Sequence, residues 1–121
     1  MSNKALVNLN TGLEDAESVT VALLVAVAAA EAGRETRMFL TKEAVRLATG
    51  GVAVGTAPAS GPSLPDLLQR YADADGRLLV CPVCFNARDL DEEALLDNAQ
   101  ITGTGPLWEW IGDDDVTTFS Y

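Results

Sequence analysis

The chain has 121 residues and a formal net charge of −10, with 18 acidic side chains against eight basic ones and no histidine. This length suits one domain with its own hydrophobic core, so we expect a single domain over residues 1–121. The basic side chains are scattered along the sequence, which argues against binding to nucleic acid or to an anionic membrane surface.

The N-terminal sequence MSNKALVNLN lacks the charged, apolar and small-residue regions of a signal peptide. The longest apolar run, residues 19–30, is too short to span a bilayer. We therefore expect a cytoplasmic protein. In a reducing compartment its two cysteines are expected to be free thiols rather than a structural disulfide.

The chain opens with an apolar segment at residues 5–9 that predicts a strand, and the polar, turn-forming sequence NLNTGLED follows. Residues 19–32 then predict a helix, with Ser18 or a nearby acidic residue as its cap and Gly33 as its stop. This helix is apolar on nearly every side. We expect it to pack against the sheet and to leave a further face for another subunit.

The same alternation of strand and helix continues in the middle of the chain. Residues 36–40 predict a second strand, and residues 42–49 predict a short helix ended by a pair of glycines. Gly, Pro, Ala and Ser dominate residues 55–65, which predicts a loop. A third helix is expected from Ser63 to about Ala72, with a proline in its first turn.

Residues 78–80 predict a third strand, and residues 83–98 carry apolar side chains at helical spacing with a break near Asp89. Three short segments complete the pattern: a strand at residues 99–102, a helix at residues 103–113 and a strand at residues 116–119. Five strands that alternate with helices predict a three-layer α/β/α sandwich around a five-stranded parallel sheet. Trp108 and Trp110 lie two apart on the last helix, so we expect one in the core and the other in a subunit contact.

Cys81 and Cys84 form a C-x-x-C pair directly after the third strand. In a parallel sheet, ligands bind beyond the carboxyl ends of the strands, and a helix that begins there favours a thiolate over a thiol. Arg88 adds positive charge if the helix turns it toward the sulfurs. We therefore predict that Cys81 is a reactive cysteine rather than a buried apolar side chain. For Cys84 two alternatives stay open: it pairs with Cys81 as a resolving thiol, or it packs against the sheet.

The residues around the two cysteines exclude several common uses of C-x-x-C. Zinc and iron–sulfur sites need about four protein ligands, and the chain offers two cysteines and no histidine, so we expect neither a metal nor another cofactor. A thioredoxin-like fold places the motif early, whereas only 37 residues follow Cys84. The absence of histidine disfavours a Cys–His nucleophile. A thiolate activated by its position remains, suited to accepting and donating sulfur or electrons.

Three stretches in this order resemble the DsrE/DsrF-like family (TusD-like and YchN-like proteins): NLNTGLEDAESVTVALLVAVAAAEAG, MFLTKEAVRLA and VCPVCFNARDL. The resemblance covers nearly the whole chain. It implies a five-stranded parallel α/β/α fold and homo- or hetero-oligomers, often trimers or hexamers, with sites near subunit interfaces; for this chain we expect a homo-oligomer. In sulfur-relay members the cysteine that matches Cys81 carries a persulfide between donor and acceptor proteins. The chain departs from those members at Cys84, and at Asp89, where a second arginine or a Gly-rich turn is common.

Polar residues also end the first two strands, namely Asn10, Thr11, Gly12 and Thr41. Their amides and hydroxyls could line the same cleft as Cys81 and hold a small anion or a sulfane sulfur; ordinary turn formation is the alternative. The resulting hypothesis is a sulfur carrier or sulfurtransferase in which Cys81 accepts sulfur as a persulfide, assisted by Arg88. The alternatives are a binding module of the same fold with structural or redox-sensing cysteines, and dithiol redox exchange through Cys81 and Cys84.

Overall fold

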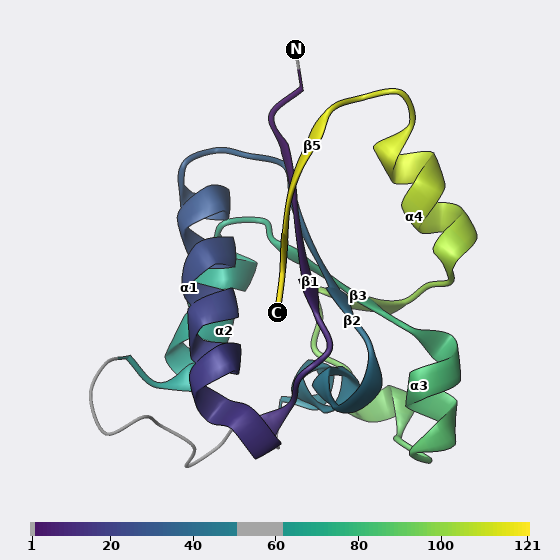
Figure 1. The fold of residues 1–121 in the computed structure, drawn as a ribbon. Coiled ribbons are helices and arrows are strands. Elements are labelled where there is room, and N and C mark those ends of the chain that lie inside the picture. Colours follow the sequence, from purple (N-terminus) through teal and green to yellow (C-terminus); the bar gives the residue numbers. More distant parts are fainter. Residues whose placement is uncertain (1, 51–61) are drawn as a thin grey trace.

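The computed structural model of the chain describes residues 2–50 and 62–121, and a central parallel sheet organises them. Its strands are β1 (Lys4–Leu9), β2 (Thr36–Leu40), β3 (Arg77–Val80), β4 (Ala99–Ile101) and β5 (Val116–Ser120). They lie in the order β4-β3-β2-β1-β5, and every neighbouring pair is parallel (Figure 1). All five predicted strands are therefore present, each within one residue of its expected bounds.

Strand register divides the sheet into an apolar face and a more polar one. Val7 pairs with Met38, and Met38 with Leu78, so these three side chains share a face, and all three are almost completely buried. The neighbouring positions Arg37 and Arg77 pair with each other and face the opposite way. Successive side chains of a strand alternate between faces, so the main core lies on the Val7 side.

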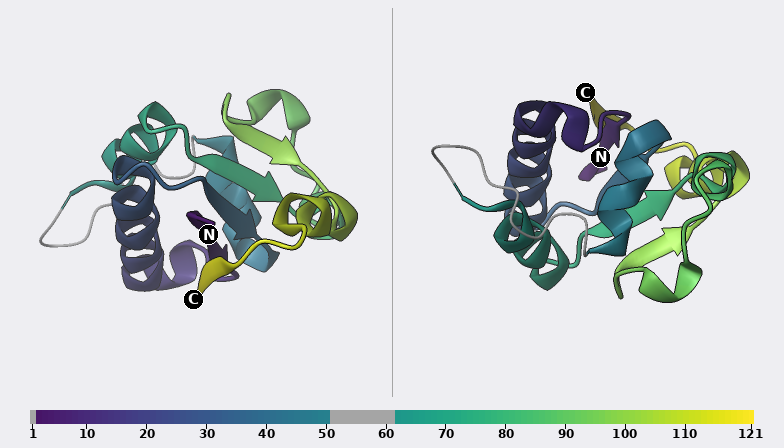
Figure 2. Two further views of the ribbon diagram at one scale, coloured as in Figure 1. Left: turned by 90° about the horizontal axis from the view of Figure 1, so that it is seen from above. Right: turned by 90° about the horizontal axis from the view of Figure 1, so that it is seen from below.

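Two helices, α1 (Ala16–Glu31) and α2 (Leu64–Asp73), cover the apolar face side by side (Figure 2). The carboxylate of Asp15 caps α1 by accepting from the backbone N–H of Ser18 at 3.1 Å, so the acidic neighbour is the cap, and the helix starts before the predicted residue 19. Gly33 ends it with a φ of 87°. The predicted cap of α2 is confirmed, because the Ser63 hydroxyl accepts from the N–H of Asp66.

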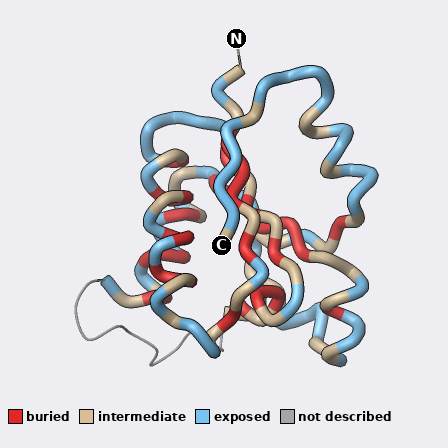
Figure 3. Tube along the Cα trace, in the orientation of Figure 1, coloured by how far each residue is buried: buried red, intermediate tan, exposed pale blue. Residues whose placement is uncertain are grey.

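The outer surface of α1 remains apolar where nothing covers it. Val21 and Leu24 are 40% and 42% exposed, whereas the inner side of the same helix is buried (Figure 3). The predicted apolar character on nearly every side is thus present, with one face on the sheet and α2 and another facing outward. Isolated apolar side chains at a surface are common, but neighbours on one helix face form a patch.

Helix α4 (Thr104–Ile111) lies over the opposite face of the sheet and completes the predicted three-layer α/β/α sandwich (Figures 1 and 2). None of its residues is buried. Lys4 Nζ and Arg37 Cζ lie 5.2 and 5.1 Å from the ring centre of Trp110. The indole Nε1 of Trp110 donates to the carboxylate of Glu35. Trp108 is 69% exposed. The prediction of a core tryptophan is wrong, because this face presents cationic side chains that hold the ring by cation–π contact.

The segment after the cysteines differs most from its prediction. A helix over residues 83–98 is wrong: α3 spans only Pro82–Ala87, Asp89 adopts a φ of 51°, and a single turn, η4 (Glu92–Ala94), follows. The predicted break near Asp89 is confirmed. Leu96 reaches the core from an extended chain whose N–H bonds to Ala48 at 2.8 Å, so apolar spacing alone imitated a helix.

Two 3₁₀ segments, η1 (Leu13–Asp15) and η2 (Lys42–Thr49), follow β1 and β2. The helix predicted at residues 42–49 is therefore present, in its tighter form, and Gly50 ends it with a φ of 64°. Gly51 and residues 55–61 of the predicted loop lie outside the described residues. Within the described ranges no helix has the length and apolar character required to cross a bilayer.

Candidate active site

The carboxyl edge of the sheet brings two of the predicted site residues next to each other. The Thr41 N–H donates to the carbonyl oxygen of Leu9, and the Cys81 N–H donates to that of Leu40, each at 3.0 Å. The sheet ladder thus continues one residue past β2 and β3. Because these strands are direct neighbours, Thr41 and Cys81 lie side by side where the chain leaves the sheet.

Both sulfurs lie at the start of α3. Cys81 precedes Pro82 in extended backbone, and Cys84 follows in the first turn; both thiols are free and half-buried. Val83, between them, is 77% exposed, so this end of α3 faces solvent. Phe85 is the residue of α3 that enters the core. Its burial fixes the helix and leaves the two cysteines at the surface of the molecule.

Arg88 lies against the backbone of Cys84. Its Nη1 donates to the carbonyl oxygen of Cys84 at 3.0 Å, and its Nε donates to the carboxylate of Glu43. The arginine side chain is only 23% exposed. The guanidinium is therefore held between the end of α3 and the start of η2.

The surroundings of Cys84 favour its thiolate. Burial raises the pKa of the Cys84 thiol, but interaction with the backbone N–H of Lys42 and with the Cys81 thiol, together with the charges of Arg88 and Lys42, brings the pKa below its usual value. The Lys42 backbone has a φ of 52°, in the left-handed region. This conformation accompanies the approach of the Lys42 backbone N–H to the Cys84 sulfur.

The surroundings of Cys81 favour its thiol. Burial raises the pKa of Cys81, and so do the hydrogen bond and the charge of the neighbouring Cys84 sulfur. The backbone N–H groups of Cys84 and Val83 oppose this effect, but they form no full capping bond to the Cys81 sulfur. The contacts thus favour the neutral thiol at Cys81 and the thiolate at Cys84.

The remaining predicted residues lie at different distances from this pair. Asn10 follows β1, which is separated from β3 by β2, and its side chain accepts from the Thr11 hydroxyl at 3.2 Å. A Cβ on Gly12 would lie 2.8 Å from both the Cβ and the backbone oxygen of Glu43. Thr41 is thus beside the cysteines, Gly12 supports η2, and the Asn10 and Thr11 side chains bond to each other in a turn.

Two residues of this site, Lys42 and Glu43, are absent from the sequence-based set. Glu43 accepts from Arg46 at 3.0 Å as well as from Arg88, and these hydrogen bonds, led by that of Arg88, lower the pKa of its carboxyl. The signal available in the sequence was position alone, because both residues directly follow Thr41, the first residue after β2. Neither residue type predicts this contact with a segment 45 residues further along the chain.

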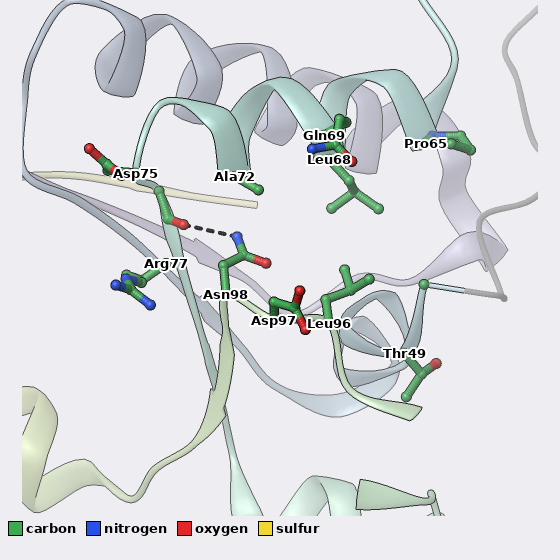
Figure 4. A pocket seen from close by; sticks show the side chains of 12 residues that line it. Thr49, Pro65, Leu68, Gln69, Ala72, Asp75, Arg77, Leu96, Asp97 and Asn98 are labelled. Carbon is green, nitrogen blue, oxygen red and sulfur yellow. Dashed lines mark hydrogen bonds between the residues drawn. The ribbon is translucent and has the colours of Figure 1, made fainter. Parts of the chain in front are cut away.

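A hollow of about 680 Å³ lies elsewhere, between α2 and the chain that leads into β4 (Figure 4). Its walls include Leu68, Gln69 and Leu96, and Asn98 donates to the carbonyl oxygen of Gly76 at 2.9 Å on one side. Neither cysteine is among its lining residues. Over residues 2–50 and 62–121, no cluster of three or more His, Cys, Asp or Glu side chains is placed to hold a metal ion.

Comparison with known proteins supplies the family. The model of the DsrE/DsrF-like family matches residues 3–119. The chain belongs to the DsrE/DsrF-like family. The family resemblance drawn from the three sequence stretches is thereby confirmed, and the match includes residues of all five strands and both cysteines. A search of the curated proteins gives no significant match to this chain.

Solved structures agree with the family. The YchN protein of E. coli is 25% identical, with a TM-score of 0.75, over 98% of this chain and 100% of YchN. MTH1491 of Methanobacterium thermoautotrophicum, a protein of unknown function, is 10% identical with a TM-score of 0.64, over 98% and 99%. BT1422 of Bacteroides thetaiotaomicron, also of unknown function, is 12% identical with a TM-score of 0.62, over 97% and 96%. The last two show the shared fold alone.

Proposed function

We propose that this DsrE/DsrF-like protein is a sulfur carrier that receives sulfur as a persulfide on its C-x-x-C pair. The observation that carries the proposal is the pair of free, half-buried thiols beside the cations of Lys42 and Arg88 at a solvent-facing edge. A thiolate is the nucleophile in sulfur transfer, and cationic neighbours stabilise it. They would stabilise an anionic persulfide in the same way.

The transfer needs no oxidant or reductant. The Cys84 thiolate attacks the outer sulfur of a donor persulfide, R–S–SH, and forms a new S–S bond. The donor's S–S bond breaks, its electron pair leaves with the inner sulfur as the thiolate R–S⁻, and the proton stays on the outer sulfur. An acceptor thiolate then attacks the same outer sulfur and regenerates the Cys84 thiolate. Donor and acceptor proteins are the expected partners, because the exposed Val83 leaves the sulfurs open to a projecting thiol.

The two cysteines have different parts in this proposal. The sequence favours Cys81 as the acceptor because it ends a strand, whereas the contacts of Lys42 and Arg88 favour Cys84 as the attacking thiolate. Mass spectrometry after exposure to a low-molecular-weight persulfide tests the function. Wild type should gain the mass of one sulfur atom, and the double variant Cys81→Ser/Cys84→Ser should gain none. If the wild-type protein gains no sulfur, the sulfur-carrier hypothesis fails, and the alternative is a binding module whose cysteines are structural or sense oxidation.

Dithiol redox exchange is a second candidate, favoured by the placement of both free thiols at the start of α3. If Cys81 attacks the inner sulfur of a Cys84 persulfide, a Cys81–Cys84 disulfide forms and hydrosulfide leaves. The two cysteines are then oxidised, and the transferred sulfur is reduced to sulfide. Counting free thiols with and without reductant after persulfide exposure separates the two outcomes. A carrier keeps its sulfane sulfur, whereas redox exchange yields one disulfide and free sulfide.

A homo-oligomer is part of the proposal. Family resemblance implies trimers or hexamers, and the outward face of α1 offers Val21 and Leu24 to a second copy of the chain. Apolar side chains gathered on an exposed helix face are typical of subunit contacts. We also propose a cytoplasmic location, since thiols stay reduced there. Light scattering coupled to size-exclusion chromatography tests the assembly, and a monomer at micromolar concentration would contradict it.

A further inference from the structure

We propose that Glu43 is a positioning residue of the cysteine site: it holds the Arg88 guanidinium against Cys84. The inference rests on the proposed function only in that it concerns Cys84, the thiolate that attacks the donor persulfide in that proposal. It adds a residue from η2 to a site otherwise made by α3. Glu43 contacts the Arg88 guanidinium, so its action on Cys84 is exerted through Arg88.

The carboxylate of Glu43 uses both oxygens on arginines. Oε2 accepts from Arg88 Nε, and Oε1 accepts from Arg46 Nε at 3.0 Å. Arg88 also donates from Nη1 to the Cys84 carbonyl oxygen at 3.0 Å. The guanidinium is thus fixed at two points by groups from two different elements. An arginine fixed in this way loses the freedom of its long side chain, so its charge stays beside Cys84.

The position of Glu43 is itself restrained by the neighbouring backbone. It follows Lys42, whose left-handed backbone turns the chain from β2 into η2. The loop after β1 approaches so closely at Gly12 that an added Cβ would meet the Cβ and the carbonyl oxygen of Glu43 at 2.8 Å. The Glu43 side chain is 42% exposed, but its backbone has little room to move toward the loop. The sheet therefore determines where the carboxylate meets Arg88.

Three groups act directly on Cys84, namely Cys81, Lys42 and Arg88. Cys81 and Arg88 flank α3, whereas Lys42 lies in η2 together with Glu43 and Arg46. Glu14, in η1, has its carboxylate 2.9 Å from the place that a Gly12 Cβ would take. In this set Glu43 has two opposite effects on Cys84. Its negative charge disfavours a nearby thiolate, whereas its hold on Arg88 favours it.

Substitution of Glu43 by glutamine separates these effects by their sign. The rate of alkylation of Cys84 by iodoacetamide at neutral pH reports its thiolate fraction, and the Cys81→Ser variant supplies a single reactive thiol. If Glu43 positions Arg88, Glu43→Gln lowers that rate by about two- to fivefold, the range of partly exposed ion pairs. If Glu43 acts through its charge alone, the rate rises. A rate that rises or stays unchanged overturns the proposal.

Two controls separate positioning from a general change of charge or stability. Glu31→Gln removes the same charge and the Glu31–Arg70 ion pair, formed at 2.8 Å on α1 and α2, and should leave the alkylation rate unchanged. In an Arg88→Ala background, Glu43→Gln should no longer lower the rate, because the arginine that it holds is gone. A further decrease in that background would contradict the proposal. The thermal unfolding temperature of each variant confirms that it is folded.

The alkylation readout needs no sulfur donor, so it can succeed where the proposed function fails. A chain that accepts no persulfide but shows the Glu43→Gln decrease retains the positioning role without the sulfur carrier. A chain that accepts persulfide and shows no decrease retains the carrier without the positioning role. If Cys81→Ser disturbs the fold, peptide mapping of the two-cysteine chain gives the Cys84 rate directly, with the same expected decrease.

Discussion

Arg88 donates from Nη1 to the carbonyl oxygen of Cys84 at 3.0 Å, which joins the cation to the same turn of α3 that carries the sulfur. This bond spans four residues and requires only the local turn. The second bond of Arg88, to Glu43, requires the sheet to bring η2 alongside α3. The properties of the cysteine pair therefore depend on both local and long-range structure, and the predictions below test each.

The order in which the two thiols ionise is the first prediction. Because the pKa of Cys84 lies below its ordinary value and that of Cys81 lies above it, Cys84 should reach half-maximal alkylation at the lower pH. Alkylation rates across a pH series, measured on Cys81→Ser and Cys84→Ser, give the two midpoints. A lower midpoint for Cys81 would reverse the assignment of the attacking sulfur.

Gly12→Ala should weaken both the fold and the site. Its Cβ would meet Glu43 at 2.8 Å, so η2 must shift, at a cost of about 1–3 kcal/mol in the free energy of unfolding. Alkylation of Cys84 should slow as well, since the shift moves Glu43 from Arg88. Gly105→Ala is the matched control, because an added Cβ there meets nothing within 4 Å. Urea denaturation compares the two, and equal stabilities would refute the close packing at Gly12.

The buried Tyr71 should make stability fall in alkaline solution. Its hydroxyl donates to the Arg77 carbonyl oxygen at 2.7 Å, and burial raises its pKa above the usual value of about 10. The neutral form is favoured in the folded chain, so this contribution is complete below about pH 10 and is lost as the pH rises further. Tyr71→Phe should cost about 0.5–1.5 kcal/mol at neutral pH and show a smaller alkaline loss. A parallel alkaline decline in both proteins would contradict this.

The outward face of α1 should hold the proposed oligomer together. Val21→Ser/Leu24→Ser makes that face polar without touching the core side of the helix, so the mass in solution should fall toward that of the monomer. Light scattering gives the mass. Thr117→Ser, at an exposed position of β5, serves as a control that should leave the mass unchanged. An unchanged mass in the α1 variant would place the subunit contact elsewhere.

Strand positions could be predicted because each strand is a short apolar run between turn-forming residues. Cys81 and Arg88 could be found for a related reason: strand ends gather at one edge, and a short helix brings residues four apart together. The false helix after Asp89 shows the limit of spacing. Leu90, Leu95 and Leu96 are partly buried and pack against the core cluster, but the chain that carries them turns at Asp89 and forms only the single turn η4 before β4.

Glu43 and Lys42 escaped prediction because their roles depend on packing between distant segments and on one unusual backbone angle. A lysine with a φ of 52° has no local sequence signal, since glycine or asparagine is the usual residue there. The tryptophans were misplaced for a similar reason. The cations of Lys4 and Arg37 come from strands far from α4 in sequence, and they make a ring at the surface favourable.

Persulfide transfer to single-cysteine variants tests the central claim most directly. After exposure to a low-molecular-weight persulfide, intact-mass analysis of Cys81→Ser should show the gain of one sulfur atom, located on Cys84 by peptide mapping. Cys84→Ser should gain little under the same conditions, and reductant should reverse every gain. The account would be contradicted if neither variant and no wild-type molecule acquired sulfur while Cys84 remained accessible to alkylation.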